Sequence, residues 1–307
     1  MTSSRATIRD VAAAAGVSPT TVSFVLNDTP GQAIPEATRH RVRSAVAQLG
    51  YTPHRIARAL REGSSRLVLL RAGPLRGSAS MASLIAGMDE ELRRHGHALI
   101  VTYGTVEAER ELLEAVAPRT VLDLVRIYGS GDSPQGDGGD VDGLEAHAAV
   151  QLGHLLELGH RSIAVALPAD PSFEPLSSLR RRQLEAAAAR AGATAIPIII
   201  PREPSGAALA LARLRAEHPR ATAIAAFNDD VAFVVLAAMH AAGLSAPDDL
   251  AVVGFDEGEH AALWNPPLSS LRIDAAEFGR RAARRALGLD TGAWQRPPSQ
   301  VVRRATT

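Results

Sequence analysis

Small hydroxyl side chains and arginines near the start of the chain are the residues best suited to bind a partner, and their chemistry fits DNA. Thr20, Thr21 and Ser23 follow closely on a break in a helical pattern. Residues 1–63 contain eight arginines and four acidic residues, although the whole chain of 307 residues balances 33 basic against 33 acidic side chains. A local surplus of positive charge attracts the phosphate backbone of DNA. The sequence therefore predicts DNA binding by its first part.

Arrangements of residues that signal catalysis are missing from the sequence. The chain has no cysteine, which removes disulfides, thiolate nucleophiles and cysteine-ligated zinc, and which is natural for a reducing cytosol. There is no GxSxG, HExxH or Walker motif. His95–His97 and the pair Gly159 and His160 are interpreted as helix C-termini rather than as metal ligands. We predict no enzyme activity, no cofactor and no metal site.

Two short helices joined by a tight turn are predicted to position the hydroxyl side chains. Thr7 is placed to cap the first helix, with Asp10 in its first turn, and Ser18 to cap the second, with Pro19 at its first position. Gly16 stands where the turn needs a positive φ. Apolar residues recur at helical spacing on both sides of this glycine: Ile8, Val11, Ala12 and Ala15, then Val22, Val25 and Leu26. A helical hairpin buried in a core would share this pattern, but the hydroxyls and arginines favour a DNA-binding helix-turn-helix.

A third helix and a linker follow the first two helices. The third helical pattern runs from about Glu36 to Leu49 and stops at Gly50. Beyond Tyr51–Pro53, the segment His54–Arg61 has the spacing of a short helix, and Glu62–Ser65 is a flexible exit. An ordinary solvated linker helix would have the same pattern.

From Leu67 onward, short apolar runs alternate with alanine-rich helical segments. This alternation is typical of parallel β-sheets covered by helices on both faces. The predicted strands are Leu67–Leu70, Ala98–Thr102, Ser162–Leu167, Ile196–Ile200, Ala223–Phe227 and Leu250–Phe255. The predicted helices are Met81–His95, Leu144–Leu158, Leu176–Ala191, Ala207–Glu217 and Asp230–Ala242. The segment Gly129–Asp140, rich in glycine and aspartate, is predicted to be a loop.

Six short patterns lie within residues 6–61: Thr7–Ala12, Ala15–Ser18, Thr21–Ser23, Val25–Asn27, Leu49–Tyr51, and Ala57 with Leu60. Together they resemble the LacI/GalR repressor family. The resemblance implies that a helix from about Ser18 to Leu26 enters the major groove, with Pro19, Thr20 and Phe24 at the positions that read bases. It also implies that Thr21, Ser23 and Asn27 contact the DNA backbone. The full set of implied DNA contacts is Thr7, Ser18, Pro19, Thr20, Thr21, Ser23, Phe24, Asn27, Tyr51, Arg55, Ala57 and Leu60.

The linker helix resembles the hinge helix of that family. In the family, two hinge helices pair across a dimer in the minor groove, and the leucine that matches Leu60 wedges between base steps and kinks the duplex. A pseudo-palindromic operator with an easily kinked central step is therefore implied. Two residues depart from the family pattern. His54 stands where the family usually has Asn, and Phe24 offers only an apolar contact, for example with a thymine methyl.

Blocks of the core resemble the family's periplasmic-binding-protein-like sensor domain. They are Leu158–Ala164, Phe227–Ala232, Pro247–Asp256 and Pro266–Leu271. Matched residue by residue, Arg180, Asn228 and Asp256 would face an effector between two lobes, near the strand ends where α/β folds bind ligands. The alternative is that Asn228 caps the following helix and that Asp256 only ends a strand.

The first lobe departs most from the family. Between Tyr128 and Leu144 the usual strand with its acidic contact is not found, and Val141-Asp142 replaces it only with an offset of about one residue. Gln183 stands where the family often has glycine beside the ligand. The effector is therefore expected to be unusual or absent.

These patterns together predict three regions. Residues 1–52 form a small all-α helix-turn-helix domain, 53–65 a hinge helix and linker, and 66–307 a two-lobed α/β core with parallel sheets. Lobe 1 comprises about 66–160 with a returning segment at about 270–290, and lobe 2 about 161–269 with the C-terminal strand.

The predicted function is transcription regulation, as a cytoplasmic, nucleoid-associated repressor. The expected partners are double-stranded operator DNA, a second copy of the chain and a sugar-like effector. Three alternatives remain: a regulator whose sensor binds no effector, a sugar-binding transport protein, and a sugar-active enzyme. No signal peptide or membrane span is predicted, which disfavours the transport protein.

Overall fold

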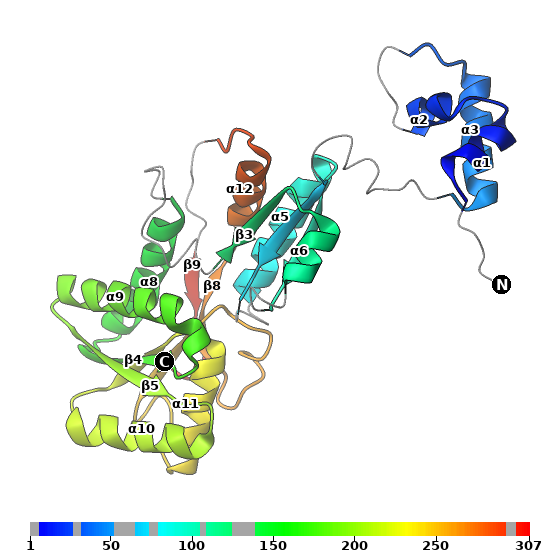
Figure 1. Ribbon diagram of the computed structural model, residues 1–307. Coiled ribbons are helices and arrows are strands. Elements are labelled where there is room, and N and C mark those ends of the chain that lie inside the picture. Colours follow the sequence, from blue (N-terminus) through cyan, green and yellow to red (C-terminus); the bar gives the residue numbers. More distant parts are fainter. Residues whose placement is uncertain are drawn as a thin grey trace. The chain divides into compact units, whose positions relative to one another are not determined.

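The computed structural model describes residues 6–26, 32–51, 65–73, 79–104, 109–124, 139–292 and 299–307. The chain divides into two compact units, Met1–Ser65 and Arg66–Thr307. Figure 1 shows the two units, with elements labelled where there is room.

The first unit contains three helices: α1 (Ile8–Ala15), α2 (Pro19–Leu26) and α3 (Glu36–Leu49). The Thr7 side chain accepts a hydrogen bond from the backbone of Asp10, and the Asp10 carboxylate accepts one from the backbone of Thr7, which completes a capping box. Gly16 ends α1 in the left-handed conformation, with φ of 65°, as the turn requires. The predicted helix bounds and caps are confirmed here.

A single apolar cluster holds the three helices together. Val11, Val22 and Val42 come from different helices, and each is completely buried. Burying a valine side chain contributes roughly 1.5–3 kcal/mol, so these three residues stabilise the packing of the three helices.

The second unit begins with a three-stranded parallel sheet of order β2-β1-β3. Its strands are β1 (Leu67–Arg71), β2 (Ala98–Thr102) and β3 (Thr120–Asp123). Helices α5 (Ala79–Arg94) and α6 (Arg110–Val116) connect them.

Helix α12 (Ala276–Leu287) returns from the end of the chain and packs along α5 (Figure 1). Two glycines bring the helices together. A Cβ added to Gly279 would lie 2.0 Å from the carbonyl oxygen of Leu84, and one added to Gly87 would lie 2.0 Å from that of Ala276. The helix backbones touch because neither glycine has a side chain.

A six-stranded sheet of order β5-β4-β6-β7-β8-β9 follows, with β9 antiparallel to β8 and the other pairs parallel. Its strands are β4 (Ser162–Pro168), β5 (Thr194–Ile200), β6 (Ala223–Ala226), β7 (Ala251–Phe255), β8 (Ser269–Ile273) and β9 (Ser299–Val302). Its helices are α8 (Gly139–Glu157), a 3₁₀ turn at Pro171–Phe173, α9 (Glu174–Arg190), α10 (Pro204–Glu217) and α11 (Asp229–Ala241).

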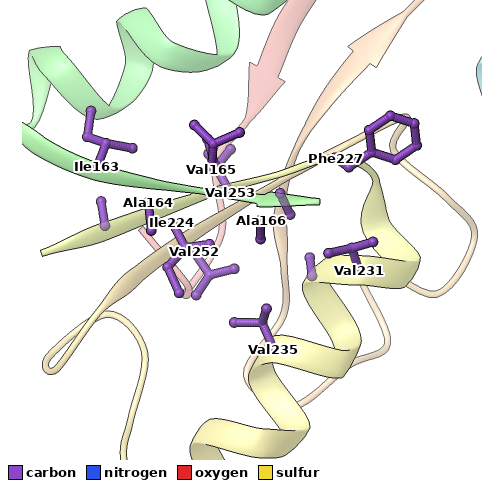
Figure 2. Packing of buried hydrophobic residues seen from close by; sticks show 14 of the residues in the cluster. Ile163, Ala164, Val165, Ala166, Ile224, Phe227, Val231, Val235, Val252 and Val253 are labelled. Atoms are coloured by element: carbon purple, nitrogen blue, oxygen red, sulfur yellow. The ribbon is translucent and has the colours of Figure 1, made fainter. Parts of the chain in front are cut away.

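Helices cover both faces of this sheet, α8 with α9 on one and α10 with α11 on the other (Figure 1). Figure 2 shows Val231 and Val235 of α11 facing the apolar side chains of the central strands. Strands β6 and β7 are buried along their whole length, which explains their continuous apolar sequence. The predicted two-lobed α/β class with mostly parallel sheets is confirmed.

Several elements differ from the predictions, which did not include strand β8 or helix α6. Strand β3 was not predicted, because its sequence Thr-Val-Leu-Asp has only two apolar residues and lies at a sheet edge. Helix α8 begins at Gly139, so the last two residues of the loop predicted at Gly129–Asp140 are helical. Within the described residues, no helix is long and apolar enough to cross a membrane.

Candidate functional site

The start of α2 presents small polar groups on the surface of the first unit. The Ser18 hydroxyl accepts a hydrogen bond from the backbone N–H of Thr21 at 3.1 Å and lies 2.9 Å from the Thr21 hydroxyl. Pro19 and Thr20 are exposed, whereas Thr21, Ser23 and Phe24 are half-buried. The start of α2 is thus on the surface of the first unit, whereas Val22 and Val25 bury the opposite side of the helix.

Two of the predicted DNA contacts have structural roles in the first unit. Thr7 caps α1, and its two hydrogen bonds, from the side chain and the backbone, lower the pKa of Asp10. Tyr51 packs against the apolar cluster of the three helices. The predicted contacts Asn27, Arg55, Ala57 and Leu60 lie outside the described residues, as does the hinge helix.

Arg41 has a contact that sequence reasoning missed. Its Nε donates to the carbonyl oxygen of Ala15 at 3.3 Å, at the end of α1 where helical carbonyls lack partners. The arginine thus ties α3 to the turn at Gly16. The surplus of arginine was assigned to phosphate binding, and nothing local distinguishes an arginine that serves the fold.

In the second unit, Arg180 of α9 is buried and hydrogen-bonded to a polar side chain of α8. Only 3% of the residue is exposed, and its Nη2 donates to Oε1 of Gln151 at 3.1 Å. Its guanidinium carbon lies 3.3 Å from the centre of the Phe255 ring, a cation–π contact. Burial lowers the pKa of Arg180 to about 9, and the negative charge of Asp256 opposes that shift. Arg180 is therefore a cation at neutral pH.

Gln151 on α8, which was not among the predicted site residues, connects Arg180 to the sheet. The side chain is fully buried. Its Nε2 donates to the carbonyl oxygens of Ala226 at 2.9 Å, Gly254 at 3.0 Å and Val253 at 3.3 Å. These carbonyls lie toward the carboxyl ends of β6 and β7. Three carbonyl acceptors on one side require the amide nitrogen there, so the carboxamide oxygen faces Arg180.

Asn228 lies at the end of β6, and its side chain is engaged in capping. Its Oδ1 accepts a hydrogen bond from the backbone N–H of Val231 at 3.0 Å, which caps α11. The structure therefore contains the contact expected from the alternative interpretation, in which Asn228 caps the following helix. Effector binding by Asn228 stays a prediction.

Asp256 follows β7 in a turn with unusual backbone angles. Asp256 has φ of 105° and Glu257 φ of 53°, both positive in residues other than glycine. The neighbouring Asp229, which is 5% exposed, holds the turn by accepting from the N–H of Gly258 at 2.7 Å and from the Ser270 hydroxyl at 2.5 Å. Burial raises the pKa of Asp229 to about 7, against the effect of these hydrogen bonds.

Two buried polar atoms near this site have no hydrogen-bond partner in the described part of the chain. They are Nε of Arg180 and Oε1 of Gln183, which lie three residues apart on α9. Gln183 is 7% exposed. Unpaired buried polar atoms cost free energy, and their presence on one helix face suits a small polar ligand.

The carboxyl ends of β1, β2 and β3 carry a separate charged group. Arg71 donates through Nε to Glu109 at 2.7 Å and through Nη1 to Asp123 at 3.0 Å. Thr102 also donates to Glu109, and that carboxylate is 3% exposed. Arg71, Thr102 and Asp123 are the last residues of their strands, so this polar edge of the sheet is already paired within the chain.

Comparison with known families accounts for both units. Residues 7–54 match the bacterial regulatory proteins of the lacI family, and residues 152–307 match the periplasmic binding protein-like domain. The HTH-type transcriptional repressor PurR of Aliivibrio fischeri strain ES114 is 30% identical over 312 residues, covering 90% of this chain and 89% of that protein. The chain belongs to the lacI family. PurR of Vibrio campbellii, at 29% identity and 90% coverage of both chains, is a similar relative of this lacI-family protein.

Solved structures of lacI-family proteins share the fold. The lac repressor dimer bound to operator and the anti-inducer ONPF has a TM-score of 0.75 at 23% identity, with 99% of both chains covered. A complex of the regulator CelR with cellobiose has a TM-score of 0.61 at 22% identity, covering 99% of this chain and all of that chain. The named relatives are transcriptional repressors rather than enzymes, in agreement with the prediction of no enzyme activity.

Proposed function

We propose that this lacI-family protein is a transcriptional repressor that binds a pseudo-palindromic operator as a homodimer. The proposal rests mainly on the geometry of the first unit. A left-handed turn at Gly16 packs α2 against α1 and leaves Pro19 and Thr20 exposed. The relatives named as HTH-type transcriptional repressors support it. A repressor of this class acts in the bacterial cytoplasm, associated with the nucleoid.

In this proposal α2 enters the major groove. Its exposed Thr20 hydroxyl reads a base edge, and Phe24 contacts a thymine methyl. Thr21, Ser23 and Asn27 hold the DNA backbone. The linker that contains Arg55 and Ala57 lies in the minor groove, where Leu60 wedges between central base steps. Thr7 and Tyr51 contact phosphates in this proposal. They also support DNA binding indirectly, because Thr7 caps α1 and Tyr51 packs against the apolar cluster of the first unit.

The surface proposed for the second copy is apolar and continues from α5 to the loop after β7. A hollow of about 620 Å³ there is lined mainly by apolar residues of α5 and by β2, an edge strand, together with Glu259. The same loop carries Leu263, which is 82% exposed, next to Trp264, whose ring stacks on Phe233 at 4.7 Å. An exposed apolar surface of this kind favours association with a protein partner. A parallel dimer would cover it and bring two copies of α2 to one operator.

The effector is proposed to be a small polar molecule, sugar-like in its density of hydroxyl groups. It would bind beside Arg180, Gln183 and Asp256, since a hydroxyl group both accepts from the free Arg180 Nε and donates to the free Gln183 Oε1. The second candidate is a repressor whose core binds no effector. The paired state of Asn228 and of the Arg71 group favours this second candidate.

DNA binding is tested by selecting sequences from a random DNA pool with the full-length protein, followed by gel-shift titration. We expect a pseudo-palindromic site, and we expect Leu60→Ala to weaken binding to it by about tenfold or more, because the wedge stabilises the kinked duplex. Leu289→Ala, at a leucine of the second unit that is 40% exposed, is the matched control. Unchanged affinity of Leu60→Ala, with circular dichroism showing a folded protein, would refute the role of the hinge.

The effector is tested by thermal shift against a panel of sugars and nucleosides. The first candidate predicts at least one compound that raises the melting temperature of the wild type and not that of Gln183→Leu. No shift with any compound of the panel, for a protein that binds its selected operator, would favour the repressor without an effector.

A further inference from the structure

Gln151 is buried against the carboxyl ends of two strands in the second unit. Its carboxamide is fully buried, and it contacts three carbonyls toward the carboxyl ends of β6 and β7 on one side and the Arg180 guanidinium on the other. The carboxyl ends of parallel strands are where α/β proteins bind their small-molecule ligands. A residue from α8 therefore supplies the polar contacts that a bound molecule would otherwise make.

We propose that Gln151 is an internal ligand of the effector site, whose carboxamide holds Arg180 until an effector displaces it. This inference rests on the proposed effector site, and it states how that site is regulated. The carboxamide uses both of its N–H groups on the carbonyls and accepts Arg180 with its oxygen. The Nε of Arg180 is buried without a partner among the described residues, and an incoming ligand can accept a hydrogen bond from it.

The helix that carries Gln151 also reaches the three-stranded part of the unit. His147, Gln151 and His154 lie at positions i, i+4 and i+7 on one face of α8, and all three are buried. The His147 ring meets Phe278 of α12 edge-on, with 6.1 Å between ring centres. Phe278 belongs to the apolar cluster that joins α12, α5 and β1. Because α8 contacts both parts of the core, a change at Gln151 can be transmitted through this helix to α12.

Chemical rescue tests this proposal on the free protein. Gln151→Ala removes the equivalent of one acetamide molecule, together with its hydrogen bonds to three carbonyls and to Arg180, so we expect the melting temperature to fall by roughly 10 °C. Acetamide should raise the melting temperature of Gln151→Ala and leave that of the wild type unchanged. Acetate, which has the same shape and no N–H group, should not replace it.

A second variant covers the case in which Gln151→Ala does not fold. Gln151→Glu keeps the volume of the side chain, but its carboxylate repels the three carbonyls, so its stability relative to the wild type should increase as the pH falls and the acid becomes protonated. A simple ion-pair partner for Arg180 would instead be most stable when ionised. A Gln151→Glu protein whose stability relative to the wild type increases as the pH rises would overturn the proposal.

The remaining outcomes separate this inference from the proposed function. A Gln151→Ala protein with wild-type stability, or one that is destabilised and insensitive to acetamide, would overturn the internal ligand. Neither measurement involves DNA, so both stand even if no operator is found. If an operator is selected, acetamide should change the affinity of Gln151→Ala for it at least about threefold, as expected for modest coupling between sites. Acetamide should leave the operator affinity of the wild type unchanged.

Discussion

Replacing Asp229 with asparagine should remove a large part of the dependence of stability on pH. Burial raises the pKa of this carboxyl from 3.8 to about 7, and the charge of Asp256 adds to the shift. At roughly 1.4 kcal/mol per pKa unit, the difference corresponds to about 4 kcal/mol. Because the pKa is raised on folding, this contribution to stability is complete below pH 4, the value of the unfolded chain. It is lost as the pH rises through 7.

Asparagine at position 229 stays neutral at every pH, and it can still meet the Ser270 hydroxyl and the Gly258 N–H. We therefore expect Asp229→Asn to be less stable than, or equal to, the wild type near pH 4.5 and more stable than it near pH 8. Between these two pH values, the free energy of unfolding of Asp229→Asn should increase relative to that of the wild type by an amount that approaches about 4 kcal/mol.

Urea-induced unfolding of both proteins at a series of pH values between about 4.5 and 8.5 measures this difference directly. Asp230→Asn, which removes the exposed carboxylate next along the same helix, controls for the loss of one charge. A difference between wild type and Asp229→Asn that stays constant with pH would refute the argument that Asp229 folds into an environment that disfavours its charge.

Two further changes test the proposed dimer and the packing of the core. Leu263→Arg should convert the dimer to a monomer in size-exclusion chromatography with light scattering, whereas Leu209→Arg, at a leucine of α10 that is 54% exposed, should leave it a dimer. Monomeric wild type, or a dimeric Leu263→Arg, would contradict the proposed surface. Gly279→Ala should lower the free energy of unfolding by roughly 3 kcal/mol, since its Cβ would lie 2.0 Å from the Leu84 carbonyl oxygen. Gly153→Ala, whose Cβ would meet nothing within 4 Å, should be neutral or slightly stabilising in the same denaturation assay, and equal losses in the two variants would contradict the packing argument.

The features that sequence analysis predicted well are those that depend on neighbouring residues. The cap at Thr7, the left-handed Gly16 and the bounds of α3 follow from residues within a few positions of each other. Four strands of the larger sheet, β4 to β7, were predicted because buried parallel strands have continuous apolar sequences, whereas β8, with the sequence Ser-Ser-Leu-Arg-Ile, was not. Strand β3 lacks that signal, since two of its four residues are polar.

The polar contacts of the core depend on residues far apart in the sequence, and they were not predicted. Gln151 meets Arg180 across 29 positions and the carbonyl of Gly254 across 103. A buried glutamine gives no local pattern, because its partners are set by the packing of α8 on the sheet. Asn228 is the intermediate case. Its capping contact is local and was one of two interpretations of the sequence, whereas an effector contact would be a property of the assembled site.

The internal pairing of polar groups sets a limit on how tightly this core can bind an effector. At the ends of β1, β2 and β3, Arg71 already satisfies two carboxylates, and at the ends of β6 and β7, Gln151 satisfies three carbonyls. A ligand that displaces either group must replace its hydrogen bonds before it gains any net affinity. The unpaired Nε of Arg180 and Oε1 of Gln183 offer contacts without such a cost. Binding of an effector should therefore be weak unless the ligand carries an amide-like group that reproduces the contacts of Gln151.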